Sequence, residues 1–88
     1  MHTFVIMITK FSKLREKEVI NICNGKRIGC VSDIELDLNT GRILRLVIPK
    51  SGKYFGFSTG KNTLYIQWQN IEKIGDDTIL VRYAELSP

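Results

Sequence analysis

The chain has 88 residues, of which 43% are hydrophobic and 25% are charged, and its net charge is +4. This length fits one domain around one core and excludes a second catalytic domain. The composition is that of an ordinary globular protein and excludes both disorder and a coiled coil. We therefore expect the chain to fold by itself.

Residues 1–10 are expected to form a flexible N-terminal extension. Their apolar run covers only residues 4–8, whereas a membrane-spanning helix needs about 20 residues and the core of a signal peptide needs roughly 7 to 15. We therefore predict a cytoplasmic protein without a membrane span. Deleting residues 1–6 is expected to leave the melting temperature within a few degrees.

One dense basic group follows, made of Lys10, Lys13, Arg15 and Lys17. Glu16 and Glu18 interleave with these cations and dilute their potential. The pattern favours a solvated amphipathic entry segment over a phosphate-binding patch.

The first strand is predicted over residues 19–23 and stops at the turn signal Asn24-Gly25. Cys23 and Cys30 flank this turn without being cross-strand partners, so we expect two small, buried, reduced thiols. Two cysteines and one histidine cannot supply the four ligands of a structural zinc site.

A long β-hairpin is predicted over residues 25–49. Its apolar residues recur at every second position, as a strand with one buried face requires; they are Ile34, Leu36, Leu38, Leu44, Leu46 and Ile48. Asn39-Thr40-Gly41 lies between the two runs, and glycine adopts a positive φ without steric cost. We therefore predict a three-residue loop over residues 39–41.

This loop fixes the register of the hairpin. The predicted cross-strand pairs are Leu38 with Arg42, Leu36 with Leu44, Ile34 with Leu46 and, on the opposite face, Glu35 with Arg45. A four-residue loop would place Glu35 opposite Leu44 and bury the wrong set of side chains, because a slip of one residue exchanges the two faces.

The C-terminal half contains further short strands, at residues 64–68, 72–74 and 78–83. A tight bend at residues 69–71 and a Gly75-Asp76-Asp77 turn separate them. Five or six short, mostly antiparallel strands with no strong helix indicate an all-β fold. At this length a small barrel hides the strand edges best. The domain is expected to span residues 11–83, with a tail over residues 84–88.

No residue set predicts an enzyme, a metal site or a cofactor site. Three carboxylates alternate at Asp33, Glu35 and Asp37, but the predicted Arg45 partner and the lack of a neighbouring His or Ser favour a solvated strand face. Trp68 with Tyr65 could stack on nucleic acid bases, although a single Trp in so small a domain favours a core role.

The predicted partner-binding surface is the Gly-containing loop over residues 50–61. Aromatic residues on loops held by a rigid scaffold often dominate interface energetics, and here lysines surround them. The candidate residues are Lys50, Lys53, Tyr54, Phe55, Phe57 and Lys61. The alternative is that Phe55 or Phe57 folds inward and plugs one end of the barrel.

Several motifs together resemble the PRC-barrel domain. They are Gly25-x-x-Ile28-Gly29-x-Val31-x-Asp33, Asp37-x-x-Thr40-Gly41-Arg42-Ile43 and Trp68-x-x-Ile71-x-x-Ile74-Gly75-Asp76-Asp77. The opening of the domain, residues 17–25, is similar to that of the stand-alone YlmC/YmxH family associated with sporulation. The resemblance implies a small PRC-type β-barrel of five or six mostly antiparallel strands.

Two functions from different classes follow. The first is a non-enzymatic, cytoplasmic interaction module that binds a protein partner or a second copy, in a sporulation-related setting implied by the resemblance. The alternative is an RNA- or ribosome-associated factor akin to the C-terminal domain of RimM, for which steep salt dependence of binding would be the signature. No small-molecule substrate is evident in either case.

Overall fold

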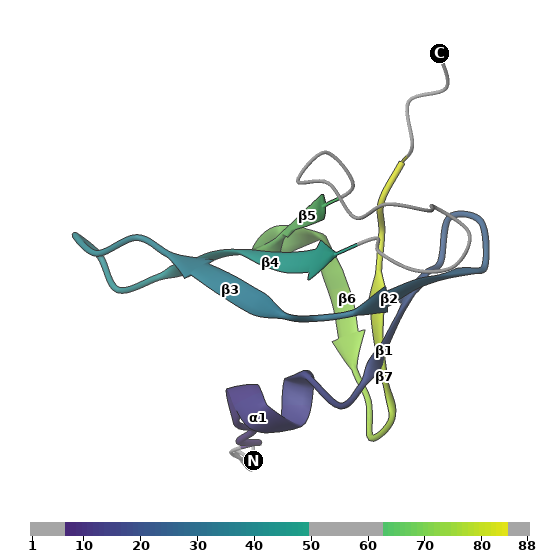
Figure 1. The fold of residues 1–88 in the computed structure, drawn as a ribbon, viewed down its shortest axis with the longest axis horizontal. Helices are drawn as coiled ribbons and strands as arrows, with labels where there is room; N and C mark the ends of the chain where they lie inside the picture. Colours follow the sequence, from purple (N-terminus) through teal and green to yellow (C-terminus); the bar gives the residue numbers. More distant parts are fainter. Residues whose placement is uncertain (1–6, 50–62, 85–88) are drawn as a thin grey trace, which may run out of the picture.

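The computed structural model describes residues 7–49 and 63–84, and these residues form two β-sheets (Figure 1). The strands within this part of the chain are β1 (Glu18–Asn21), β2 (Lys26–Cys30), β3 (Asp33–Leu36), β4 (Ile43–Pro49), β5 (Thr63–Gln67), β6 (Ile71–Ile74) and β7 (Thr78–Val81). A four-residue helix, α1 (Phe11–Leu14), and a 3₁₀ turn, η2 (Trp68–Asn70), complete the described elements. The all-β prediction is confirmed, with seven described strands instead of five or six.

The strands divide between a four-stranded and a three-stranded sheet. The first sheet has the order β2-β1-β7-β6 and the second has the order β3-β4-β5. Only the β1 and β7 pair among the described strands is parallel, and every other pair is antiparallel. The parallel pair joins the start of the domain to its end.

The first half of the predicted long hairpin forms two strands rather than one. The chain changes sheets at Val31, which is buried, and Ser32, whose backbone N–H donates to the Val47 carbonyl over 2.9 Å. β2 therefore pairs with β1, while β3 pairs with β4. At Gly29, with φ of +146°, a Cβ atom would lie 3.3 Å from Cγ2 of Ile48. The glycine thus permits the close approach of the two sheets.

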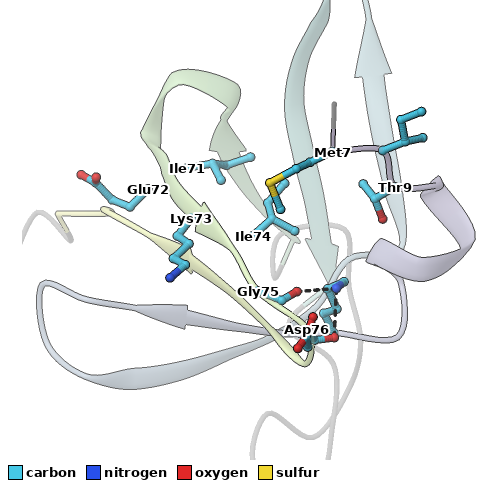
Figure 2. A pocket seen from close by; sticks show the side chains of 10 residues that line it. Met7, Thr9, Ile71, Glu72, Lys73, Ile74, Gly75 and Asp76 are labelled. Atoms are coloured by element: carbon cyan, nitrogen blue, oxygen red, sulfur yellow. Dashed lines mark hydrogen bonds between the residues drawn. The ribbon is translucent and has the colours of Figure 1, made fainter. Parts of the chain in front are cut away.

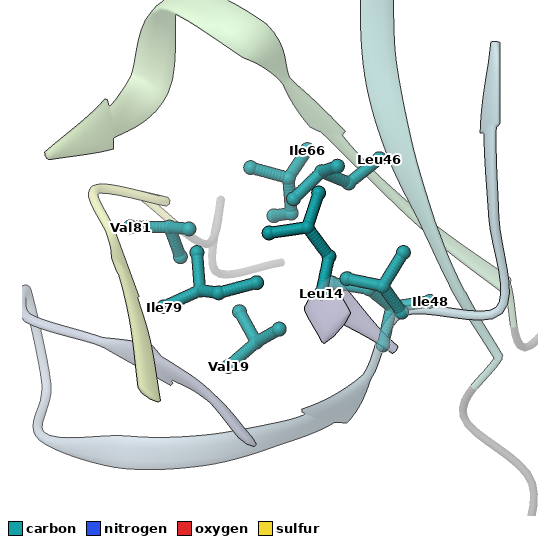
Figure 3. Close-up of a cluster of buried hydrophobic side chains, with 8 residues drawn as sticks. Leu14, Val19, Leu46, Ile48, Ile66, Ile79 and Val81 are labelled. Carbon is teal, nitrogen blue, oxygen red and sulfur yellow. The ribbon is translucent and has the colours of Figure 1, made fainter. Parts of the chain in front are cut away.

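The core lies between the two sheets and is closed by the helix (Figure 3). Its buried apolar side chains are Leu14, Val19, Val31, Leu46, Ile48, Ile66, Ile79 and Val81. Residues on β1, β4 and β7 alternate between buried and more exposed positions, as the pleat requires. The entry segment was predicted without a helix; α1 forms there because Leu14 inserts into the core.

Asn21 is the buried polar residue of the described core, with 1% of its surface exposed. Its Oδ1 accepts hydrogen bonds from the backbone N–H groups of Cys23 (3.1 Å) and Tyr83 (3.0 Å), and its Nδ2 donates to the Tyr83 carbonyl (2.6 Å). One side chain therefore satisfies backbone groups of both the β1–β2 turn and the strand end after β7.

The prediction of two buried cysteines is wrong. Asn21 pairs with Lys26, so Cys23 lies within the turn over residues 22–25 and is exposed to solvent. Cys30 pairs with Glu18 at the other end of β2 and is also exposed. Both thiols are free.

The predicted C-terminal turns are confirmed. Residues 68–70 form the 3₁₀ turn between β5 and β6, and Gly75-Asp76-Asp77 separates β6 from β7, with the Gly75 N–H donating to the Thr78 carbonyl over 2.8 Å. Trp68 packs against the core while remaining partly exposed. No helix in residues 7–49 or 63–84 is long and apolar enough to cross a membrane.

Candidate interaction surface

The predicted partner-binding residues Lys50, Lys53, Tyr54, Phe55, Phe57 and Lys61 lie outside the described residues. The flanking residues are described: Pro49 on β4 pairs with Thr63 on β5. These two strand ends lie at the end of the second sheet opposite the β3–β4 turn.

The β3–β4 hairpin projects from the rest of the molecule (Figure 1). Its loop has four residues, 38–41, because the Asp37 N–H donates to the Arg42 carbonyl over 2.8 Å. The predicted three-residue loop is therefore wrong, although Gly41 does take a positive φ, of +74°. We call residues 36–44 the arm.

A β-bulge in the arm restores the predicted register at the base of the hairpin. Leu36 pairs with Ile43, but Glu35 pairs with Arg45, so Leu44 is the extra residue on β4. The bulge offsets the shift that the four-residue loop introduces. The predicted pairs Ile34 with Leu46 and Glu35 with Arg45 are confirmed, while the pairing of Leu36 with Leu44 is wrong.

The arm carries an uncovered apolar face. Leu36 follows Ile34 by two residues and so continues the core-facing side of β3, yet it is 48% exposed. Leu44 is 39% exposed and Leu38, in the loop, is 94% exposed. The predicted burial of Leu36 and Leu44 is wrong, because the described core ends at Leu46.

A groove of about 700 Å³ lies beside the arm. One wall is formed by residues 41–44 and the other by Gln67, Trp68 and Gln69, where the chain turns away from β4. Since Trp68 also packs against the core, the groove lies at the junction between the arm and the body of the domain.

A second groove, of about 480 Å³, runs along β6 (Figure 2). It is lined by Met7, Ile8, Thr9 and Lys17 together with residues 71–76, and the Met7 side chain points toward Ile74. Lys17 Nζ donates to the carbonyl oxygens of Gly75 and, over 2.9 Å, Asp76. This lysine holds the β6–β7 turn, which is a structural role.

Acidic partners accompany many of the basic side chains on the described surface. The described ion pairs are Lys13 with Glu16 (3.6 Å), Arg27 with Glu18 (3.0 Å), Arg82 with Glu72 (2.8 Å) and Arg45 with Glu35. The hydrogen bond that Arg82 donates to the Glu72 carboxylate raises the pKa of the Arg82 guanidinium above its usual value. The described surface therefore has mixed charge rather than one basic patch.

The carboxylates considered for metal binding or catalysis have structural partners. Asp33 Oδ1 accepts from the Ile34 N–H (3.3 Å), Asp37 Oδ1 accepts from the Asn39 N–H (2.9 Å), and Glu35 pairs with Arg45. Within residues 7–49 and 63–84, no cluster of three or more His, Cys, Asp or Glu side chains could hold a metal ion.

Tyr65 and Trp68, considered as a stacking pair, lie in different surroundings. Tyr65 is 47% exposed and has the Arg45 guanidinium carbon 6.0 Å from its ring centre. Trp68 belongs to η2 and packs against the core. The described geometry therefore supplies no shared aromatic platform.

Comparison with known proteins assigns the family. The family model of the PRC-barrel domain matches residues 8–87. The chain belongs to the PRC-barrel domain family. The resemblance inferred from the motifs is thus confirmed.

This PRC-barrel protein is also similar to small stand-alone proteins. It is 42% identical over 74 residues to the probable sporulation protein YlmC of Bacillus subtilis, an alignment covering 84% of this chain and 91% of the relative. It is 32% identical over 81 residues to the uncharacterised protein YmxH of the same species, covering 90% and 94%. An uncharacterised protein of Clostridium acetobutylicum is 35% identical over 68 residues, covering 77% of each chain.

Proposed function

We propose that this PRC-barrel protein is a non-catalytic, cytoplasmic interaction module that binds a protein partner through the arm. The observation that carries the proposal is the exposure of three leucines of the arm, Leu36, Leu38 and Leu44, which the described residues leave uncovered. Leu36 continues the core-facing side of β3. An exposed apolar patch of this kind, rimmed by polar residues, is typical of a protein interaction site. The name of YlmC supports a sporulation-related setting.

The mixed charge of the surface favours a protein partner over RNA. Binding to nucleic acid draws most of its strength from cations that neutralise phosphates. Arg27, Arg45 and Arg82 each form an ion pair with a carboxylate of the same chain instead. Weak dependence of partner binding on salt would agree with the proposal, and a steep dependence would favour the RNA-associated alternative.

Residues 50–61 are proposed as a second contact with the partner, through Tyr54, Phe55 and Phe57. Replacing these three residues by Ser would spare stability and reduce partner capture if they form a contact. An unfolded triple variant, or a folded one that retains every partner, would contradict this part of the proposal.

The test of the arm is affinity capture from cells with the full chain, with and without nuclease. Leu38→Lys places a charge on the apolar face at a residue that is 94% exposed, so folding should not change. Ile8→Lys is the matched control, because Ile8 is 84% exposed and lines the groove along β6. We expect Leu38→Lys to lose nuclease-resistant protein partners that Ile8→Lys retains. Equal capture by both variants would contradict the proposed docking surface.

A further inference from the structure

We infer that the arm docks onto a second copy of this chain, with Leu38 of each copy seated in the groove beside the arm of the other. This inference rests on the proposed function and specifies its partner. It requires a projecting apolar side chain and a matching recess on the same molecule. The structure has both: Leu38, 94% exposed in the arm loop, and the groove of about 700 Å³ lined by Ile43, Leu44 and Trp68.

The positions of the two features fit two-fold symmetry. Leu38 lies at the tip of the arm, and the groove extends from residues 41–44 back to residues 67–69 at its base. Two arms that cross in opposite directions bring the tip of each to the base of the other. The same contact then forms twice, which is the property of a closed two-fold dimer.

The apolar faces of the two arms would cover each other in this arrangement. Leu36 extends the core-facing side of β3 beyond the described core, and Leu44 is the bulge residue next to its partner Ile43; both leucines are more than a third exposed. Packing one arm face on the other removes both sets from water, as two sheets do in a sandwich. The arm of each copy would thus cover the exposed leucines of the other, which the described residues of a single copy leave in contact with solvent.

The charge distribution also favours a second copy at this place. The arm contains one acidic residue, Asp37, and one basic residue, Arg42, so its net charge is zero, and the rest of the chain carries the whole net charge of +4. Two copies therefore meet without a local excess of like charge at the arm. Asp37 precedes Leu38, and Arg42 lines the groove, so seating Leu38 brings opposite charges near each other across the interface.

The first experiment measures self-association of the full chain by sedimentation velocity over a range of concentrations. Truncating a hot-spot residue at the centre of an interface weakens binding about 30-fold or more, and Leu38→Lys removes the contact twice in a symmetric dimer. We expect this variant to raise the dimer dissociation constant by about a thousandfold. Ile8→Lys should change the constant by less than about threefold, because Ile8 lies on the other groove.

The second experiment tests by disulfide trapping whether Leu38 of one copy lies in the groove of the other. Cys23 and Cys30 are exposed and are first replaced by Ser. In that background, a Leu38→Cys chain is mixed with a Gln69→Cys chain under mild oxidation. We expect a covalent heterodimer as the main product, and little from mixing Leu38→Cys with Ile8→Cys. Equal trapping in the two mixtures would overturn the inference.

The two proposals fail in different ways. If the native chain stays monomeric up to about millimolar concentration while Leu38→Lys still abolishes capture of a different protein, the second-copy inference is overturned and the arm stands as a docking surface. If neither self-association nor capture depends on Leu38, both are overturned. If Leu38→Lys leaves dimerisation unchanged but abolishes capture of a different protein, only the second-copy geometry is overturned.

Discussion

The two ends of the β3–β4 hairpin carry the same kinds of side chain in opposite surroundings. At the base, Leu46 is fully buried between the sheets, whereas Leu36 and Leu44 in the arm are 48% and 39% exposed. All three belong to one alternating pattern. The difference shows that alternation identifies which side chains share one face of a strand. Whether that face is buried depends on how far the opposite sheet extends along it.

The largest predicted difference in stability between the base and the arm is that between truncating a leucine at the base and truncating one in the arm. Leu46→Ala should lower the free energy of unfolding by about 2 to 5 kcal/mol, because it leaves a cavity in the packed core. Leu36→Ala, at the exposed end of the same hairpin, should cost less than about 1 kcal/mol. Urea denaturation of the two variants at a concentration that keeps the chain monomeric checks this. Comparable losses would break the division into base and arm.

Two side chains that cap turns sharpen the comparison. Asn21 binds three backbone groups in the buried body, whereas Asp37 accepts one hydrogen bond in the partly exposed arm. Asn21→Ala leaves three partly buried backbone groups without their partner, and an unsatisfied buried group costs about 1 to 3 kcal/mol. Because water can reach the exposed Cys23, we expect a total loss of at least about 2 kcal/mol. Asp37→Ala should cost less than about 1 kcal/mol, because water replaces its single bond. Thermal unfolding measures both, and equal losses would contradict the assignment of Asn21 as a buried link.

The smallest expected effect concerns the ion pair on the outer face of the hairpin. The Glu35 and Arg45 side chains are 43% and 37% exposed, so Glu35→Ala should change stability by less than about 1 kcal/mol. The difference from the native chain should also shrink at high salt, which screens exposed pairs. Denaturation at low and high sodium chloride tests this. A loss as large as that of Leu46→Ala would mean that the outer face is the buried one.

Much of the fold follows from local signals. The turns at Gly25 and Gly75, the positive φ of Gly41 and the pairs Ile34 with Leu46 and Glu35 with Arg45 are confirmed, because turn chemistry and period-two alternation act over a few residues. The family also follows from these turn motifs. The sequence does not predict the described helix α1, because its four residues are too few to show a helical pattern of apolar residues. Leu14 becomes part of the core only through tertiary packing.

Most of the remaining errors have one physical origin. The bulge at Leu44, the change of sheet at Val31-Ser32 and the exposure of Cys30 depend on how strands pair and sheets meet, which no local pattern encodes. Cys23 is exposed for a local reason, because it lies within the turn over residues 22–25. Gly29 was a usable signal, because a glycine inside an apolar strand often marks a close backbone approach. The arm could have been suspected from the number of alternating leucines, which exceeds what a small core can cover.

The most direct measurement of the central claim is a methyl NMR spectrum of selectively labelled leucines over a dilution series of the full chain. The account predicts that the methyl signals of Leu36, Leu38 and Leu44 shift with concentration, while those of Leu14 and Leu46 in the core stay unchanged. Arm signals that stay constant from micromolar to millimolar concentration, or core signals that shift equally, would contradict the arm as the surface on which a second copy docks.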